Sequence, residues 1–331
     1  NFFGNDGDTV YDIFSLANPG KCLGATSQYG QCHGDRIYVV SKQTGSGNGV
    51  TGGQLAVLDA QTLELAGQID EIDGRTSGAR AFCAWDTHKG YLTTDKGIFI
   101  VNLDEMSITA PVNNLDIIDS FDTFGEMAVM GDYVFVTLKY GGVAVIDPAQ
   151  DDITAIIPAE LATTLVTTAD GSLYAATQDE ESEFVRITTT EPFATSSVNI
   201  NEDKCKIANI WTTWKKAPIA AAKDGNAVFY TTVADNATTV ARYDFDSDTF
   251  TRDFITLPGT ADGEQADWVL YGSGISVDPA TGLVVLMAVE KGYGTHYRQN
   301  RIYYADPSDG HILTDKTVTL RPYYWFPSMA L

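Results

Sequence analysis

The residues best suited to binding chemistry are aromatic and charged side chains in the segments that lead into predicted strands and in the loops between those strands. An aromatic ring can stack on the apolar face of a sugar or on another flat ring while neighbouring polar groups form hydrogen bonds. This combination predicts a ligand-binding surface, although the same rings could instead fill gaps between neighbouring sheets. The candidate residues are Trp211, Trp214, Trp268, Tyr271, Tyr297, Arg298, Tyr323, Trp325, Tyr140 and Glu126.

One loop, "KGYGTHYRQN", concentrates several of these features. Its glycines, Gly292 and Gly294, allow unusual backbone dihedrals. Tyr293, His296, Tyr297 and Arg298 could therefore project over an opening at the centre of the fold. The alternative is a solvated hairpin tip with no partner.

Catalytic motifs are sparse. Of the four histidines, His88 and His311 fall at predicted turns, where a solvated imidazole is the ordinary role. The sequence has neither a G-x-S-x-G elbow nor an HExxH pair. We therefore expect a protein that is not an enzyme.

Metal-binding patterns are also weak. The run "DFDSD" resembles the start of a calcium loop but lacks the glycine at position six and the distal glutamate. Glu126, Asn209 and Asp267 could hold an axial calcium ion, as in a lactonase-like propeller. No cofactor is expected, Ca²⁺ is possible, and a calcium-dependent propeller hydrolase or lyase is the alternative function.

The four cysteines form no C-x-x-C pair. Cys22 and Cys32 bracket a short segment and are the candidate disulfide if the protein is exported. The alternative is four buried free thiols, and pairing of Cys83 with Cys205 is left open.

The formal charge of −23 comes from 21 basic and 44 acidic residues. Such a charge repels phosphate backbones and anionic lipids, so we expect neither nucleic-acid nor membrane-surface binding. No apolar run approaches the roughly 20 residues of a transmembrane helix. The chain begins with Asn1 rather than methionine, from which we expect a signal to have been removed.

An internal repeat predicts the architecture. A short apolar run, an aspartate, a polar turn and a second extended run recur at intervals of about 40–60 residues, as propeller blades do. Each aspartate can accept a backbone N–H two residues on and close a hairpin as an Asx-turn. The repeated positions are Asp59, Asp104, Asp147, Asp246 and Asp306, with Thr188 in the same place.

Two further predicted strands precede each hairpin, which makes four strands per repeat. Six repeats can be counted, over 23–70, 78–112, 124–158, 162–200, 209–257 and 271–320. The termini, "DTVYDIFSLA" and "YYWFPSMAL", predict an outer and an innermost strand of one further blade. The expectation is an all-β, seven-bladed β-propeller forming a single domain over 1–331, with its last blade closed by the N- and C-terminal strands.

A family resemblance rests on "YDIFSLANPGKCLGATSQYGQCHGDRIYVVSKQ", the repeated hairpins and "YYWFP". These segments resemble exported β-propeller lipoproteins of Bacteroidetes, of the YVTN/YncE-like surface-layer type. The resemblance implies export, tethering at the outer membrane as a cell-surface or periplasmic protein, and a TonB-dependent outer-membrane receptor as partner. A distant BtuG-like relative implies corrinoid capture.

Taken together, these patterns predict a non-catalytic, extracytoplasmic propeller that captures a small molecule. The ligand could be a glycan or a corrinoid-like nutrient, and an outer-membrane partner protein is a further possibility. A structural adhesion protein is the other alternative to the calcium-dependent enzyme.

Overall fold

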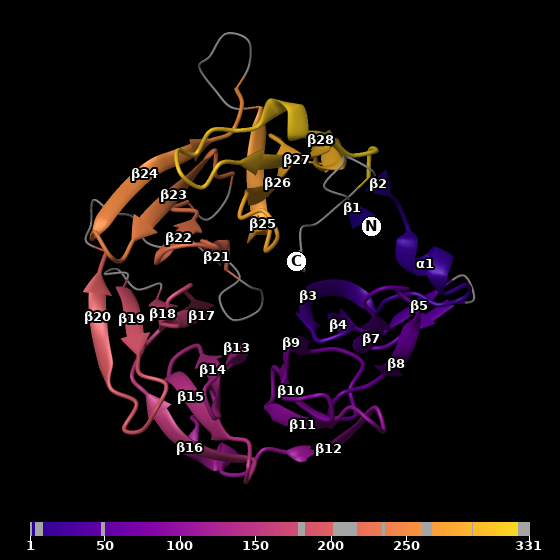
Figure 1. Ribbon diagram of the computed structural model, residues 1–331. Coiled ribbons are helices and arrows are strands. Elements are labelled where there is room, and N and C mark those ends of the chain that lie inside the picture. Colours follow the sequence, from indigo (N-terminus) through magenta and orange to yellow (C-terminus); the bar gives the residue numbers. More distant parts are fainter. Residues whose placement is uncertain are drawn as a thin grey trace. The chain divides into compact units, whose positions relative to one another are not determined.

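The computed structural model describes residues 2–3, 9–47, 50–177, 183–200, 217–233, 236–259, 267–292 and 294–323. The chain divides into two compact units, with the boundary between Glu160 and Leu161. Each unit contains three four-stranded antiparallel sheets in which consecutive strands pair as a meander (Figure 1). The single domain expected over 1–331 stays a prediction.

The first unit begins with short elements and then forms its three sheets. The short elements are β1 (Phe2–Phe3), β2 (Thr9–Val10), α1 (Ile13–Ala17) and the hairpin of β5 (Gly45–Gly47) with β6 (Val50–Gly52). The sheets are β3 (Ala25–His33), β4 (Arg36–Gln43), β7 (Leu55–Asp59) and β8 (Leu65–Ile69); β9 (Ala79–Ala84), β10 (Lys89–Thr94), β11 (Ile98–Asn102) and β12 (Ser107–Pro111); and β13 (Phe124–Met130), β14 (Tyr133–Leu138), β15 (Gly142–Asp147) and β16 (Asp152–Ile157). The 3₁₀ helix η1 (Leu115–Ile117) lies between β12 and β13.

The second unit repeats this plan. Its sheets are β17 (Ala162–Thr167), β18 (Leu173–Thr177), β19 (Glu183–Ile187) and β20 (Thr195–Asn199); β21 (Ile219–Ala221), β22 (Ala227–Tyr230), β23 (Thr239–Asp244) and β24 (Thr249–Thr256); and β25 (Trp268–Val277), β26 (Val284–Glu290), β27 (Asn300–Ala305) and β28 (Val318–Thr319). Two 3₁₀ helices, η4 (Gly294–Arg298) and η5 (Thr314–Lys316), flank β27. Within the described ranges, no helix has the length and apolar character needed to cross a bilayer.

The all-β prediction is confirmed, but the predicted number of blades is wrong. The described residues form six four-stranded blades rather than seven. The segment predicted as an outer strand ends after two residues, because β2 pairs only with β1, through Phe2↔Val10 and Phe3↔Thr9. Asp12 then takes a left-handed conformation (φ 56°), and α1 follows directly. The predicted closing strand, with Trp325, lies outside the described residues.

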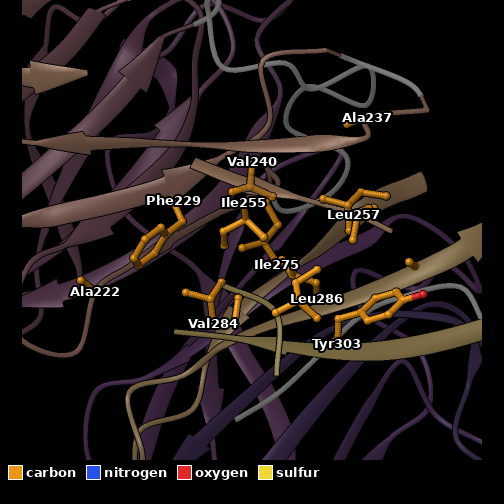
Figure 2. Close-up of a cluster of buried hydrophobic side chains, with 14 of the residues drawn as sticks. Ala222, Phe229, Ala237, Val240, Ile255, Leu257, Ile275, Val284, Leu286 and Tyr303 are labelled. Atoms are coloured by element: carbon orange, nitrogen blue, oxygen red, sulfur yellow. The ribbon is translucent and has the colours of Figure 1, made fainter. Parts of the chain in front are cut away.

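Neighbouring blades within a unit bury their apolar faces against each other. In the second unit, Phe229, Val240 and Ile255 come from the β21–β24 blade. They meet Val284 and Leu286 of the β25–β28 blade (Figure 2). All five side chains are completely buried. Burying a side chain of this size contributes about 1.5–3 kcal/mol, so these faces hold adjacent blades together.

The Asx-turn prediction is confirmed for three of the repeated aspartates. The carboxylate of Asp59 accepts the backbone N–H groups of Gln61 and Thr62, both at 2.9 Å. Asp147 and Asp306 likewise each accept the N–H two residues on, at 2.8 Å. These carboxylates close the hairpins between the third and fourth strands, as the local sequence predicts.

For two hairpins the prediction identified the wrong residue. Asn102 accepts the N–H groups of Asp104 and Glu105 at 3.0 and 2.9 Å. Asp244 accepts the N–H of Ser247 at 3.0 Å. The turn-forming residue therefore stands two positions before the predicted Asp104 and Asp246, because an asparagine or an earlier aspartate already occupies the last strand position.

Each of these five hairpins has a residue with positive φ four places after its turn-forming residue. These residues are Leu63, Met106, Asp151, Asp248 and Gly310. A left-handed conformation costs a non-glycine residue roughly 1–2 kcal/mol, so other contacts must offset it. Met106 packs over Gly67 of β8 in the preceding blade, where a Cβ would lie 2.5 Å from its Cγ atom.

Candidate functional site

The predicted binding residues fall into three groups. Trp211, Trp214 and Trp325 lie outside the described residues. Trp268, Tyr271, Tyr297, Arg298 and Tyr323 belong to the last blade of the second unit and its flanking segments. Glu126 and Tyr140 belong to the third blade of the first unit and the turn beside it. The last blade thus brings together the largest described group.

Trp268 opens β25 and makes a cation–π contact. The guanidinium carbon of Arg301, on β27, lies 4.3 Å from the centroid of the indole ring. Tyr303 approaches the same ring edge-on, with centroids 6.4 Å apart. A guanidinium within about 6 Å of a tryptophan centroid is attracted by the ring quadrupole. Two side chains of β27 therefore contact the indole ring of Trp268.

Tyr271 and Tyr297 form a tilted aromatic pair, with centroids 5.5 Å apart and an interplanar angle of 47°. Tyr271 stands in a bulge of β25, where the register shifts between Leu270↔Ala288 and Ile275↔Leu286. Bulges commonly re-aim a side chain next to a functional site. Tyr297 comes from η4, so the pair joins a strand to the loop that the sequence singled out.

Asn300 fixes the position of this loop. Its buried amide nitrogen donates to the carbonyl oxygens of Tyr297 and Tyr323, at 3.1 and 3.0 Å. The N–H of Tyr323 also donates to the carbonyl of Arg298, at 2.9 Å. The side-chain oxygen of Asn300 is buried and accepts no hydrogen bond from the described residues. η4 is thereby tied to the segment that follows β28.

A polar cavity of about 300 Å³ lies beside η4, which these hydrogen bonds hold in place. His296 Nδ1 and Glu290 Oε2 are 2.8 Å apart across one side of it. Gly292 (φ 134°) makes room for the imidazole, because a Cβ there would lie 2.8 Å from the ring. The volume is at the lower end for small-molecule pockets, which span about 300–1,000 Å³. The lining residues are Glu290, Thr295, His296, Arg298, Gln299 and Pro322.

Sequence reasoning identified the loop but not the residues that stabilise it. Arg301 and Glu290 lie outside the predicted loop, and Asn300, its last residue, was not among the predicted site residues. The sequence indicates these residues only by their position, because they lie at the ends of the two strands that flank the glycine-containing loop. The contact from Asn300 to Tyr323 spans 23 residues, and no local pattern announces it.

Glu126 and Tyr140 lie in different surroundings from each other. Glu126 is 8% exposed and occupies a bulge of β13, between the pairs Phe124↔Leu138 and Met127↔Val136. Burial, and then the charge of Glu126, raises the pKa of Tyr29 well above its usual value. Tyr140 is half exposed, and the ammonium group of Lys139 lies 4.8 Å from its ring centroid.

The first strands of the other two blades in this unit also carry buried polar residues at bulges. Gln28 of β3 donates from its side-chain nitrogen to the carbonyl of Ala79, at 3.1 Å. Arg80 of β9 is 4% exposed, and burial lowers its pKa to about 10 against the opposing charge of Asp95. The sequence signal that was missed is a charged residue interrupting an apolar strand, as in "ARAF".

The predicted disulfide is absent, because Cys22 and Cys32 are both free thiols. They flank most of β3, whose residues from Ala25 to Cys32 span more than about 20 Å at 3.3 Å each. A disulfide needs Cα atoms within about 7 Å. Cys83 is a buried free thiol, and Cys205 lies outside the described residues. Across the described ranges, no group of three or more His, Cys, Asp or Glu side chains is placed to hold a metal ion.

Among the solved structures that resemble this chain, the Dos1 propeller supports the propeller fold. The Dos1 propeller matches with a TM-score of 0.50 at 11% identity, covering 75% of this chain and 62% of that one. The β-propeller domain of Cps50 (Swd1) from Myceliophteria thermophila matches with a TM-score of 0.47 at 14% identity, covering 82% and 95%. PorZ, a surface component of the type-IX secretion system of Porphyromonas gingivalis, matches with a TM-score of 0.49 at 15% identity, covering 91% of this chain and 33% of PorZ.

Sequence comparison defines the family. None of the curated proteins matches this sequence. A family model does match, over residues 1–331, and its description is a domain of unknown function, DUF5074. This β-propeller chain therefore belongs to the DUF5074 family.

Proposed function

We propose that this protein is a non-catalytic, extracytoplasmic propeller that captures a glycan at the last blade of its second unit. The observation that carries the proposal is the Tyr271–Tyr297 pair lying in the same blade as a polar cavity. Sugar recognition uses this combination, because the ring faces of a pyranose are apolar while its hydroxyl groups need donors and acceptors.

The cavity residues suit hydroxyl recognition. Arg298 and Gln299 carry N–H donors, Glu290 carries an acceptor, and the Glu290–His296 contact fixes both side chains. The cavity of about 300 Å³ is small. Its size favours a single sugar ring over a corrinoid, whose macrocycle is much larger. A corrinoid is therefore the second choice of ligand.

The donor set favours binding over catalysis. Glycoside hydrolysis ordinarily needs two carboxyl groups on either side of the scissile bond. Among the described residues that line the cavity, Glu290 supplies one carboxylate. The proposal requires no cofactor, and a calcium ion would be an addition rather than a component of this site.

The location and the partner rest on the sequence resemblance. Exported lipoproteins of the YncE-like type imply a place at the outer membrane, with a TonB-dependent receptor receiving the ligand. The formal charge of −23 supports solubility there.

The test is calorimetric titration of the full chain with a panel of mono- and oligosaccharides and with cyanocobalamin. We expect one class of sugar to bind, and Tyr297→Ala to weaken that binding at least about tenfold, equivalent to 1.4 kcal/mol. Tyr140→Ala removes a half-exposed tyrosine of the first unit and should leave the affinity unchanged.

Two outcomes would contradict the proposal. The first is the absence of sugar binding, and the second is equal affinity in wild type and Tyr297→Ala. Tight binding of cyanocobalamin alone would select the corrinoid. Repeating the titrations with EDTA and with Ca²⁺, while assaying glycoside hydrolysis, tests the calcium-dependent alternative.

A further inference from the structure

The loop that joins β12 to β13 presents large apolar side chains to solvent. Phe121 is 82% exposed and Ile117 is 53% exposed. Both belong to the first unit, and neither is part of the proposed glycan site. Large apolar groups that gather on a surface commonly mark an interaction site.

These side chains lie beside a cavity of about 720 Å³. Its apolar lining comes from Leu115, Ile118 and Phe124, together with Phe121 itself. Four aspartates, one lysine and one serine complete the lining: Asp95, Asp116, Asp119, Asp122, Lys96 and Ser120. We call this region, made by the 112–123 loop and the turn after β10, the 112–123 surface.

Hydrogen bonds hold this loop in shape. Asp122 is 6% exposed, and its carboxylate accepts the N–H groups of Thr123, Tyr140 and Gly141 at 2.9, 2.9 and 2.6 Å. Asp119 accepts the N–H of Phe121 at 2.9 Å. An ordered loop loses little conformational freedom on binding, so the exposed phenylalanine is preorganised for contact.

The charge of the 112–123 surface is negative and partly uncompensated. Asp95 accepts a hydrogen bond from Arg75 at 2.7 Å, and Asp122 is satisfied by backbone groups. Asp116 and Asp119 are exposed and make no ion pair with a described residue. A complementary partner must therefore carry a positively charged group for the aspartates beside an apolar group for the exposed phenylalanine.

We propose that the 112–123 surface docks a segment of a partner protein that carries lysine or arginine beside a large apolar side chain. The apolar group packs against Phe121 and the cavity wall, and the cation meets Asp116 and Asp119. A second copy of this chain is the wrong occupant, because two surfaces of a protein with a charge of −23 repel each other.

The test uses the full chain and three fluorescent dodecapeptides of equal length. One alternates lysine with leucine, one alternates lysine with serine, and one alternates glutamate with leucine. At 150 mM salt we expect saturable one-to-one binding of the lysine–leucine peptide and none of the glutamate–leucine peptide. The lysine–serine peptide should bind at least about tenfold more weakly, because it lacks the apolar contact.

Variants locate the binding. Phe121→Ala and the pair Asp116→Asn/Asp119→Asn should each weaken the lysine–leucine peptide at least about tenfold. The Asp119→Asn change keeps a side-chain oxygen that can accept the N–H of Phe121, so the loop is preserved. The control pair Glu105→Gln/Asp132→Asn removes the same charge from exposed positions elsewhere in the first unit and should change nothing. Circular dichroism and melting confirm that each variant is folded.

Three results would overturn the proposal. They are the absence of binding, equal binding of the lysine–serine and lysine–leucine peptides, and equal weakening by the control pair. The last two would show unspecific attraction to an acidic protein. Self-association that Phe121→Ala abolishes, seen by sedimentation, would instead assign the surface to a second copy.

Discussion

The two units share one plan of strands but differ in the chemistry of their loops. In the first unit, the 112–123 surface combines carboxylates with apolar side chains. In the second, the last blade carries a pair of tyrosines and a smaller cavity lined by arginine, histidine and glutamine. The comparison teaches that the buried strand faces determine the blade, while the connections between strands determine what it can bind.

The strands that begin the blades differ in a related way. The bulges of the first unit bury Gln28, Arg80 and Glu126, two of which are ionisable. The bulges of β17 and β25 bury Thr163 and Ser273, which are neutral. Buried charges need compensation that hydroxyl groups do not. The bulges of the first unit therefore need more electrostatic compensation than those of β17 and β25.

The largest effect should come from the shared part of the plan. Phe135→Ala in the first unit and Phe229→Ala in the second each remove a completely buried ring. Each should lower the free energy of unfolding by about 3–5 kcal/mol. Urea denaturation followed by circular dichroism measures this, with Phe121→Ala as the exposed control at no more than about 0.5 kcal/mol. A loss below about 1 kcal/mol in either core variant would break the equivalence of the units.

A smaller effect should come from the polar anchors of the two surfaces. Asp122→Ala removes the charged acceptor of three backbone N–H groups and should cost about 1.5–3 kcal/mol, whereas Asn300→Ala removes the donor to two carbonyl groups and should cost about 1–3 kcal/mol. Denaturation midpoints measure both. Asn300→Asp keeps the volume but removes the donors, so it should be as damaging as Asn300→Ala. If it is harmless, Asn300 acts through packing alone.

The smallest effect should come from acid titration of two matched aspartate–arginine pairs. Burial acts to raise the pKa of Asp95, but the hydrogen bond and charge of Arg75 outweigh it and lower that pKa. Burial likewise acts to raise the pKa of Asp244, and hydrogen bonds from Ser247 and Arg242 lower it. A lowered pKa in the folded state stabilises the protein above the unfolded pKa of about 3.9. That stability is lost as the pH falls through the folded value.

Melting curves between pH 6 and pH 2 test this comparison. Asp95→Asn and Asp244→Asn should each flatten the fall in melting temperature on acidification, and by similar amounts. The exposed control Asp132→Asn should follow the wild type. Unchanged steepness in both variants would show that neither ion pair affects acid stability, and flattening in one alone would separate the units.

Much of the blade plan was predictable because its signals are local. A hairpin closed by Asp59 or Asp306 depends on neighbours two or three residues away, and such patterns are visible in one sequence. The predicted repeat over 23–70 coincides closely with the sheet from Ala25 to Ile69. The prediction of a seventh blade was wrong because strand pairing is not a local property. A strand pattern at the N-terminus cannot show that β2 will pair with β1 and end before Asp12.

The candidate site was predictable only in part. The glycines that precede Tyr297 mark an unusual loop, and the structure places Tyr271 against it. Asn300 donates to Tyr323 across 23 residues, and His296 meets Glu290 across a loop. Both contacts, and the cavity beside them, depend on how the loop folds in three dimensions. A single sequence contains no measure of such distances. The charge of Arg301 was visible, but its stacking on Trp268 follows from strand register.

Two of the positive-φ residues at the hairpins between third and fourth strands have a consequence for how such chains can be rebuilt. Met106 needs the gap above Gly67, and Gly310 lies where a Cβ would touch the Phe254 carbonyl, so both reach back to the sheet before their own. A transplantable module therefore starts one strand earlier than a sheet diagram suggests. If whole sheets were exchanged or duplicated, the last strand of the preceding sheet would have to match the turn of the inserted sheet. The contact between that strand and that turn must therefore be kept when sheets are recombined.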